Sequence, residues 1–436
     1  MRVLFVTWDG PTTRYLESLF LPIFARLRAA GVEVHVVQFG WGEERHVHAV
    51  AAAAERIGIR YHFRPVRKHG GPLGIAATLL TGTLWITRYV RRVGIDVVMP
   101  RSIIPAAMTL AARAIGTRAR LVYDADGLMA DERIDFGGWC ATDTRYRVLR
   151  RVERAAVRSA DLVLVRTRRA AAILAERAAP DDRIRVSLVA NGRDPSVYRP
   201  SSEPERTRVR EAIGVGATAP LLVYAGSLGP QYHPDRMLAF FAEVHRRRPD
   251  ARLLVLSSMP LDPRWMPCAG AARDAVCHRA VEPGAVATYL GAADLGVAFR
   301  MPSLSQQAVA PIKVGEYLLC GLPVVATTGV GDLDACIDAS VGRLLPALDD
   351  DDLRLAGEWF VERVLPDRDA YRDRCRRAGV TLFGLSHTVR QYLDALDVAV
   401  NGAHHSGVLA VANRAPRARG AGPVRAREPA GRAQHG

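Results

Sequence analysis

The segment from residue 310 to residue 332 carries the strongest chemical signature in the sequence. Pro311 suits the first position of a helix and Gly321 the position just past its end, so a short helix is expected between them. Lys313 falls in the first turn, where a positive charge opposes the helix dipole unless an anion lies nearby, and Glu316 follows on the same face. This pair fits a diphosphate held by Lys313 and a hydroxyl group held by Glu316. The alternative is a surface ion pair worth less than about 1 kcal/mol.

An alternation of apolar strands and helices must position this segment. In the first half of the chain, strands are expected at 2–7, 33–39, 59–64, 96–100, 121–124, 162–166 and 184–189, with helices between them. The alternation restarts with strands at 221–225, 252–257, 295–299 and 324–326. Near-continuous apolar strands of this kind are typical of parallel sheets covered on both faces. Because the strand at 295–299 precedes the helix, the N-terminus of that helix is expected at the carboxyl edge of a sheet, where anions bind.

The pattern predicts an α/β protein with two tandem doubly wound, Rossmann-like domains and a cleft between their sheet edges. The expected first domain is 1–196 and the second is 197–384, with a polar, turn-rich crossing between them. A C-terminal helix is expected within 385–402. Residues 403–436 are rich in Ala, Gly, Pro and Arg and are expected to be disordered.

The bulk properties narrow the class of protein. The formal net charge is +15, which predicts attraction to an anion: nucleic acid, a phospholipid surface or a phosphorylated substrate. The longest apolar run, 75–87, is shorter than the roughly 20 residues that span a bilayer. No signal-peptide pattern precedes the first strand, so a cytoplasmic protein is expected, with peripheral contact to the inner face of the membrane as one option. The sequence has no helix-turn-helix, RNA-recognition or zinc motif, and no nucleic acid is expected as a partner.

The run from Pro311 to Asp332 resembles the donor-site signature of retaining glycosyltransferases of family four, which have the two-domain GT-B fold. Three further segments agree with this resemblance: Tyr224-Ala225-Gly226-Ser227-Leu228-Gly229, Asn191-Gly192-Arg193-Asp194, and Tyr123-Asp124-Ala125-Asp126-Gly127 with the acidic residues that follow it. The resemblance extends over nearly all of residues 1–400. It implies that the last helix returns to pack on the first domain.

The resemblance implies transfer of a hexose-type sugar from a nucleoside diphosphate to a hydroxyl acceptor, with retention at the anomeric carbon. Glu316 would anchor the donor sugar and Lys313 would stabilise the departing diphosphate. The other expected donor contacts are Gly226, Ser227, Leu228, Arg300, Pro311 and Asp332. No metal and no cofactor are expected, and the acceptor is a glycan, a lipid-linked compound or a small molecule.

Two departures from the family pattern stand out. The position eight residues before Glu316, usually glutamate, is Ala308. The positions after the glycine loop, where Arg and Lys are common, are Gln231, Tyr232 and His233. Positive charge for the diphosphate must therefore come mainly from Lys313, with help from Arg300 and from backbone N–H groups.

The first domain supplies the expected acceptor side of the cleft. Asp126, with Asp124, is predicted to orient acceptor hydroxyls; the alternatives are helix capping and a DxD-type metal site. Arg101 follows a strand at the same edge, where it would meet substrate or form a salt bridge to one of these carboxylates. Gly10 lies in an expected loop after the first strand, where it would contact the acceptor or serve only as a turn.

Two rival functions remain. A sugar-nucleotide epimerase or phosphorylase on the same fold would use the same donor pocket without a separate acceptor. A protein that binds an anionic surface, either membrane or nucleic acid, would instead depend on the net positive charge and the Arg-containing tail.

Overall fold

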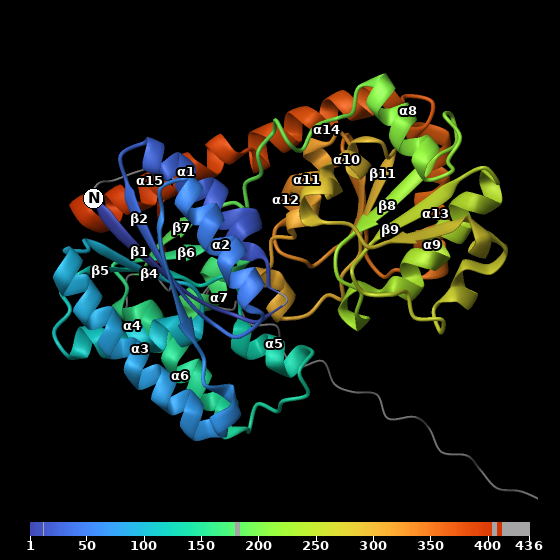
Figure 1. Cartoon of the computed structure of the whole chain (residues 1–436). Coiled ribbons are helices and arrows are strands. Elements are labelled where there is room, and N and C mark those ends of the chain that lie inside the picture. The colour runs from blue at the N-terminus through green and yellow to red at the C-terminus, as the bar shows by residue number, and fades with distance from the viewer. Residues whose placement is uncertain (12, 179–183, 403–407, 412–436) are drawn as a thin grey trace, which may run out of the picture.

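The computed structural model describes residues 1–11, 13–178, 184–402 and 408–411, which form two α/β lobes side by side (Figure 1). Each lobe is built on one sheet with helices on both faces. This arrangement confirms the predicted α/β class and the two tandem Rossmann-like domains.

The first lobe contains an eight-stranded sheet in the order β14-β7-β6-β5-β4-β1-β2-β3. Its strands are β1 (Arg2–Asp9), β2 (Glu33–Gly40), β3 (Arg60–Pro65), β4 (Val97–Pro100), β5 (Arg120–Asp124), β6 (Leu162–Val165), β7 (Ile184–Leu188) and β14 (Val408–Val411). The helices are α1 (Leu21–Ala29), α2 (Glu44–Arg56), α3 (Gly71–Val93), α4 (Ile103–Ala114), α5 (Met129–Asp135), α6 (Thr144–Ser159) and α7 (Arg168–Ala178). Strands β1 to β7 pair in parallel, and the central β4 is buried along its whole length because helices cover both faces.

The second lobe contains a six-stranded parallel sheet in the order β10-β9-β8-β11-β12-β13. Its strands are β8 (Leu221–Ala225), β9 (Arg252–Leu256), β10 (Val276–Arg279), β11 (Leu295–Ala298), β12 (Val324–Thr327) and β13 (Gly342–Leu345). The helices are α8 (Glu203–Ala212), α9 (Pro234–Arg247), α10 (Val286–Gly291), α11 (Ile312–Leu319), α12 (Leu333–Cys336), α13 (Asp350–Trp359) and α14 (Arg368–Phe383). Helices α9 and α13 pack on one face of the sheet, while α10, α11 and α14 pack on the other.

The chain crosses between the lobes twice, and the two crossings touch. The first lies between β7 and α8, and the second lies at Gly384, between α14 and α15 (Leu385–Asn401). Arg193 and Gly384 form a backbone bridge: the Arg193 N–H donates to the Phe383 carbonyl at 2.8 Å, and the Leu385 N–H donates to the Arg193 carbonyl at 2.8 Å. Figure 1 shows α14 over the second lobe and α15 over the first, where Tyr392 joins the core.

The C-terminal segment differs from the expectation of disorder from residue 403 onward. Strand β14 adds to the sheet edge, antiparallel to β7, with Val408 opposite Ser187. Backbone pairing with this short stretch satisfies hydrogen-bonding groups that β7 would otherwise expose as an edge strand. The remainder of the predicted tail, 403–407 and 412–436, lies outside the described residues.

Candidate active site

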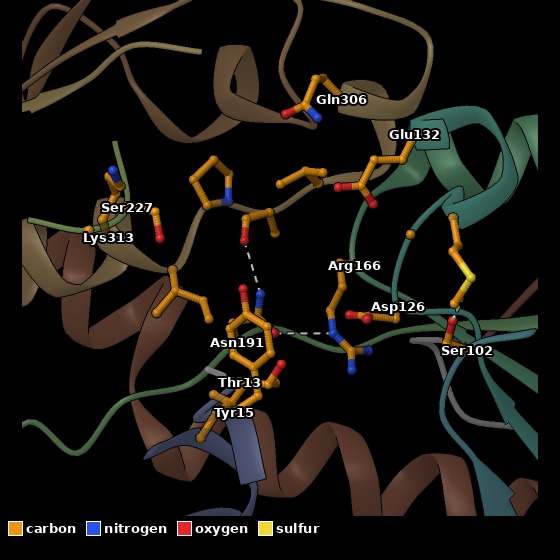
Figure 2. Close-up of a pocket in the computed structure, with 18 of the residues that line it drawn as sticks. Thr13, Tyr15, Ser102, Asp126, Glu132, Arg166, Asn191, Ser227, Gln306 and Lys313 are labelled. Carbon is orange, nitrogen blue, oxygen red and sulfur yellow. Dashed lines mark hydrogen bonds between the residues drawn. The ribbon is translucent and has the colours of Figure 1, made fainter. Parts of the chain in front are cut away.

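A cavity of about 600 Å³ lies between the lobes at the carboxyl ends of both sheets. Figure 2 shows Lys313 and Ser227 at one end, Asp126, Ser102 and Glu132 at the other, and Asn191 between them. The first group comes from the second lobe, and the Asp126 group comes from the first. Ligands of doubly wound sheets gather at this position because loops and helix N-termini converge there.

Lys313, in the first turn of α11, is buried in a cradle of aromatic rings. Its Nζ lies 3.8 Å from the centre of the Tyr224 ring and 5.1 Å from that of Tyr232. Among the described residues, no hydrogen-bond acceptor reaches this atom. Burial lowers the pKa of Lys313 well below its ordinary value; the nearby Arg300 guanidinium lowers it further, and the Glu316 carboxylate opposes the shift. A buried ammonium without a hydrogen-bond partner is a strong candidate for an anion site.

The glycine loop after β8 approaches this ammonium. Gly226 has φ 135°, and a Cβ built there would lie 3.1 Å from Lys313 Nζ, so the position favours glycine for both conformation and space. The Tyr224 hydroxyl donates to the Ser227 carbonyl at 2.5 Å and fixes the turn. The glycine loop was expected to offer backbone N–H groups to a phosphate. The Gly226 N–H instead donates to the Leu256 carbonyl at 2.9 Å, so this amide is not available.

Helix α11 begins one residue later than expected and ends as expected. Pro311 is its N-cap and lines the cavity. At the other end, Gly321 has φ 75°, its N–H donates to the Leu318 carbonyl at 2.9 Å, and the Leu322 N–H donates to the Tyr317 carbonyl at 2.9 Å. This is the Schellman arrangement, which stops the helix after little more than two turns and leaves its N-terminus facing the cavity.

Arg300 adds a second cation beside Lys313. Its backbone N–H donates to Thr327 Oγ1 at 2.8 Å, and its guanidinium lies 5.0 Å from the centre of the Tyr232 ring. Nε of Arg300 is buried and has no hydrogen-bond partner among the described residues. Two under-coordinated cations therefore share one end of the cavity.

Glu316 is held by Arg193, which was expected only as part of the crossing between the two domains. Arg193 Nε lies 2.8 Å and Arg193 Nη2 lies 2.6 Å from Glu316 Oε1, and both side chains are about nine-tenths buried. The same guanidinium donates through Nη1 to the Ser18 carbonyl in the first lobe and stacks on Tyr198. Glu316 still lines the cavity, so one of its oxygens is fixed by Arg193 while its carboxylate borders the proposed donor space.

The other end of the cavity is formed by charged groups of the first lobe. Asp126 has φ 61°, an uncommon conformation for a residue with a side chain, and it forms a close ion pair with Arg101. Glu132 on α5 faces the same space, as Figure 2 shows. Burial raises the pKa of Glu132, the carboxylates of Asp126 and Asp135 add to the shift, and nearby arginines oppose it.

Asp124 does not reach the cavity, which corrects its prediction as an acceptor contact. Its side chain is completely buried, and its Oδ2 lies 2.8 Å from Arg166 Nη2 and 3.6 Å from Arg101 Nη1. Arg166 Nε in turn donates to Asn191 Oδ1 at 3.1 Å, and Asn191 Nδ2 donates to the Ala310 carbonyl at 2.9 Å. Asp124 thus orders a chain of polar groups that runs along the cavity floor into the second lobe.

Three further predicted contacts lie away from the cavity wall. Leu228 packs in the core of the second lobe. Gly10 accepts the Thr13 N–H at 3.2 Å in a turn, while the neighbouring Asp9 lines the cavity instead. Asp332 accepts the backbone N–H of Arg168 at 2.6 Å and that of Arg169 at 3.4 Å, because its carboxylate caps α7 across the interface between the lobes.

Asp9 and Arg166, which line the cavity, were not predicted from the sequence. Glu132 was expected only as part of the acidic stretch, and Asn191 and Arg193 only as part of the crossing between the domains. Asp9 and Arg166 could have been found, because each stands at the carboxyl end of a strand of the first sheet. Within the described residues, no group of three or more His, Cys, Asp or Glu side chains is arranged to hold a metal ion. Asp124 and Asp126 each form an ion pair with an arginine in this structure.

Comparison with known proteins is consistent with this geometry. Residues 18–187 match the family model of the glycosyl transferase 4-like domain, and residues 219–363 match that of glycosyl transferases group 1. D-inositol 3-phosphate glycosyltransferase of Segniliparus rotundus is 30% identical over 168 residues, which are 37% of this chain and 35% of that protein. A protein of the same name from Nocardioides sp. is 28% identical over 239 residues, covering 49% of this chain and 48% of that protein. The matched segments thus span less than half the length of these curated relatives.

Similarity to solved structures extends over most of the chain. HepE of Anabaena, solved in complex with UDP, superimposes with a TM-score of 0.70 at 16% identity, covering 91% of this chain and all of the other. Sucrose-phosphate synthase from Thermosynechococcus elongatus gives a TM-score of 0.66 at 16% identity, covering 92% of this chain. At these identities the likeness establishes the arrangement of the two lobes.

Proposed function

Because the chain belongs to the glycosyltransferases of family four, with their GT-B fold, we propose that it moves a sugar from a nucleoside diphosphate to a hydroxyl acceptor. Retention at the anomeric carbon is part of the proposal and rests on family membership. The donor occupies the Lys313 end of the cavity and the acceptor occupies the Asp126 end. The complexes of HepE with UDP and with UDP-glucose make uridine nucleotides the first donors to test.

The observation that carries the proposal is the buried Lys313 ammonium, next to Gly226 and Arg300, which finds no acceptor in the part of the chain that the structure describes. A diphosphate at this end of the cavity would supply the missing counter-charge. When the bond from the sugar to the diphosphate breaks, negative charge grows on the leaving oxygen. Cations fixed beforehand at that position lower the barrier because they do not need to reorganise during the reaction.

Position 313 holds a lysine in a chain whose basic residues are almost all arginines. The whole sequence contains only two lysines, Lys68 and Lys313, although Lys and Arg together number 60. A compact ammonium fits between the rings of Tyr224 and Tyr232, whereas a planar guanidinium needs more space. Lysine also changes its pKa readily on burial, so it can be held in this position without the full cost of a buried charge.

At the acceptor end, Asp126 and Glu132 face the space beside the donor site. We propose that these carboxylates accept hydrogen bonds from the acceptor and orient the attacking hydroxyl. Arg101 fixes Asp126, and Asp124 fixes Arg101 and Arg166 from behind. The acceptor itself is a glycan, a lipid-linked compound or a small molecule, with inositol phosphates included because of the matched relatives.

Nucleotide binding tests the proposal directly. UDP, GDP and ADP are screened by thermal shift and isothermal titration with the unaltered protein, the Lys313→Met variant and a Lys68→Met control, which changes the only other lysine. We expect one nucleotide to stabilise the unaltered protein and the control, and to bind Lys313→Met at least tenfold more weakly. If no nucleotide binds, or if Lys313→Met binds normally, the proposed donor site is wrong.

Product analysis separates transfer from the rival reactions on the same fold. The protein is incubated with the nucleotide sugar alone and then with candidate acceptors, and free nucleotide, sugar isomers and glycosylated product are followed. Product that appears only with an acceptor supports transfer. Isomerised sugar or sugar phosphate formed without an acceptor would instead identify an epimerase or a phosphorylase.

A further inference from the structure

One face of α3 is apolar and open to solvent, in contrast to the usual arrangement of a surface helix. Leu73 is 83% exposed and Leu80 is 63% exposed. Leu84 and Arg88 continue the same face at four-residue steps, with Leu84 half-buried and Arg88 exposed. We call this surface, made by Leu73, Leu80, Leu84 and Arg88, the α3 face.

The opposite side of α3 explains why the leucines point outward. This side presents the small residues Gly74, Thr78 and Gly82, all of them buried. A Cβ on Gly82 would lie 2.7 Å from Met108 Sδ and 2.8 Å from a ring carbon of Phe39, so the helix packs closely at this point. In its first half, the helix therefore turns small residues inward and Leu73 and Leu80 outward, the reverse of the pattern expected for a helix in contact with water. Further along, Ile86 and Val90 pack in the core in the usual way.

The charges in the chain segment that contains α3 have one sign. Residues 56–95 contain no Asp or Glu. The basic residues in this stretch are Arg56, Arg60, Arg64, Arg67, Lys68, Arg88, Arg91 and Arg92. Aromatic rings accompany two of them: Lys68 Nζ lies 3.8 Å from the centre of a Trp41 ring, and the Arg64 guanidinium carbon lies 5.9 Å from that of Trp85. Leucine, tryptophan and basic side chains without acids are the composition of surfaces that enter the headgroup region of anionic membranes.

We propose that the α3 face docks on an anionic lipid bilayer, with α3 lying in the plane of the membrane surface. Among the described residues, α3 is the one helix long and apolar enough to cross a membrane by length and composition. It does not do so here, because its Gly82 side stays packed on α4 and β2. Docking would bury Leu73 and Leu80 among acyl chains and place Arg88 near lipid phosphates.

Self-association is a poorer match for the same face. In a two-fold dimer built on α3, equivalent surfaces meet, so Arg88, Arg91 and Arg92 of one copy would approach the same basic stretch of the other. Residues 56–95 offer no carboxylate to offset this repulsion. An anionic lipid surface meets both requirements of the face, burial of leucines and compensation of positive charge.

The position of α3 relates the docked membrane to the cavity. Helix α3 follows β3, so its first turn lies at the carboxyl edge of the first sheet, the edge from which Asp9, Arg101 and Asp126 line the cavity. Figure 1 shows the helix along the outer side of the first lobe. Docking through Leu73 would thus bring the edge that carries the acceptor end of the cavity towards the lipid surface.

Vesicle binding tests this inference without measuring glycosyl transfer, so it can fail or succeed independently of the proposed function. The full chain is mixed with vesicles of phosphatidylcholine alone or of phosphatidylcholine with phosphatidylglycerol, and bound protein is separated by flotation. We expect binding only to the mixed vesicles and weaker binding as salt increases. The double variant Leu73→Glu/Leu80→Glu should bind at least about tenfold less, because two exposed leucines lose their insertion into lipid.

Matched controls distinguish the α3 face from other causes. Leu355→Glu/Val380→Glu changes two exposed apolar residues on helices of the second lobe and should leave binding unaltered. Circular dichroism shows whether each variant is folded. The inference is overturned if the unaltered protein ignores the mixed vesicles, if Leu73→Glu/Leu80→Glu binds as well as the control, or if only truncation after residue 411 removes binding. It is also overturned if Leu73→Glu/Leu80→Glu converts a dimer to a monomer without changing vesicle binding.

Discussion

Replacement of Lys313 by methionine should make the unliganded protein more stable and the enzyme far less active. Nζ of Lys313 is buried, lies against aromatic rings and has no hydrogen-bond acceptor among the described residues. Leaving a buried polar group unsatisfied costs about 1–3 kcal/mol, and more when it is charged. Methionine has similar length and needs no acceptor. We therefore expect the free energy of unfolding to rise by about 1–3 kcal/mol in Lys313→Met.

The same substitution removes a cation aimed at the charge that develops on the departing diphosphate. Loss of one such preorganised group reduces turnover by about 100- to 1000-fold in comparable sites. The expected result is a pair of opposite changes, higher stability and a kcat/KM lower by at least about 100-fold. Lys68→Met, at the edge of the first lobe, should alter neither quantity by a comparable amount.

The pH dependence of the free energy of unfolding provides an independent test of the buried Lys313 ammonium. The pKa of Lys313 in the folded protein is lowered from its ordinary 10.5. Between the lowered value and 10.5 the unfolded chain therefore binds more protons than the folded one, and the stability of the unaltered protein rises with pH. Below the lowered pKa the destabilising contribution is fully present. The stability difference between Lys313→Met and the unaltered protein should therefore be largest at low pH and shrink as pH increases through this window.

Chemical denaturation without nucleotide, repeated at several pH values, measures the stability change, and initial rates with saturating acceptor measure kcat/KM. The reasoning is refuted if Lys313→Met is markedly less stable than the unaltered protein, since Lys313 would then be paired in the native state. It is equally refuted if activity stays within about threefold of normal, because a missing preorganised cation costs far more than that.

Substitutions at three other positions test the remaining parts of the cavity. Arg193→Met leaves Glu316 buried without its partner and should destabilise the protein by about 3 kcal/mol in denaturation while raising the donor KM; unchanged stability would show that the ion pair is not formed. Asp126→Gly and Asp126→Ala both remove the ion pair with Arg101 and should weaken acceptor binding, but the glycine variant should be the more stable by about 1 kcal/mol because it relieves the left-handed backbone; equal stability of the two variants would contradict the strained conformation. Glu132, whose pKa is raised by burial, should lose its charge at a higher pH than an ordinary glutamate, so the acid limb of the pH–rate profile should disappear in Glu132→Gln; an unaltered limb would assign that ionisation to another group.

Much of the fold could be read from the sequence because apolar strands buried on both faces leave long, unambiguous runs. The strand at residues 221–225 coincides with β8, and the fold class and family are confirmed. Strands β10 and β13 were missed, since each is four residues long and carries partly exposed positions, which remove the continuous apolar pattern. Their places at the two edges of the second sheet explain this exposure.

The chemistry of the cavity was less accessible to sequence reasoning, because contacts between distant residues determine which side chains are available. Lys313 could be assigned to the proposed anion end from its charge and its place in the first turn of a helix, whereas Arg300 was expected there from the family resemblance. Arg193 and Glu316 are 123 residues apart, and no local pattern predicts their ion pair. Asp124 and Asp332 have the residue type expected of substrate contacts. However, the Asp124 carboxylate is bound by Arg166, and the Asp332 carboxylate accepts backbone N–H groups at the N-terminus of α7.

The position of Arg193 has a mechanical consequence. Its backbone lies at the point where the two crossings between the lobes touch, while its guanidinium contacts Glu316 of the second lobe and the Ser18 carbonyl of the first. A rotation of one lobe about this pivot moves Glu316 and Ser18 relative to each other. The single Arg193 side chain then loses at least one of its two contacts, so the angle between the lobes and the freedom of the Glu316 carboxylate are geometrically linked. An open molecule and a closed molecule should therefore differ in the hydrogen bonds that Glu316 can offer to a sugar.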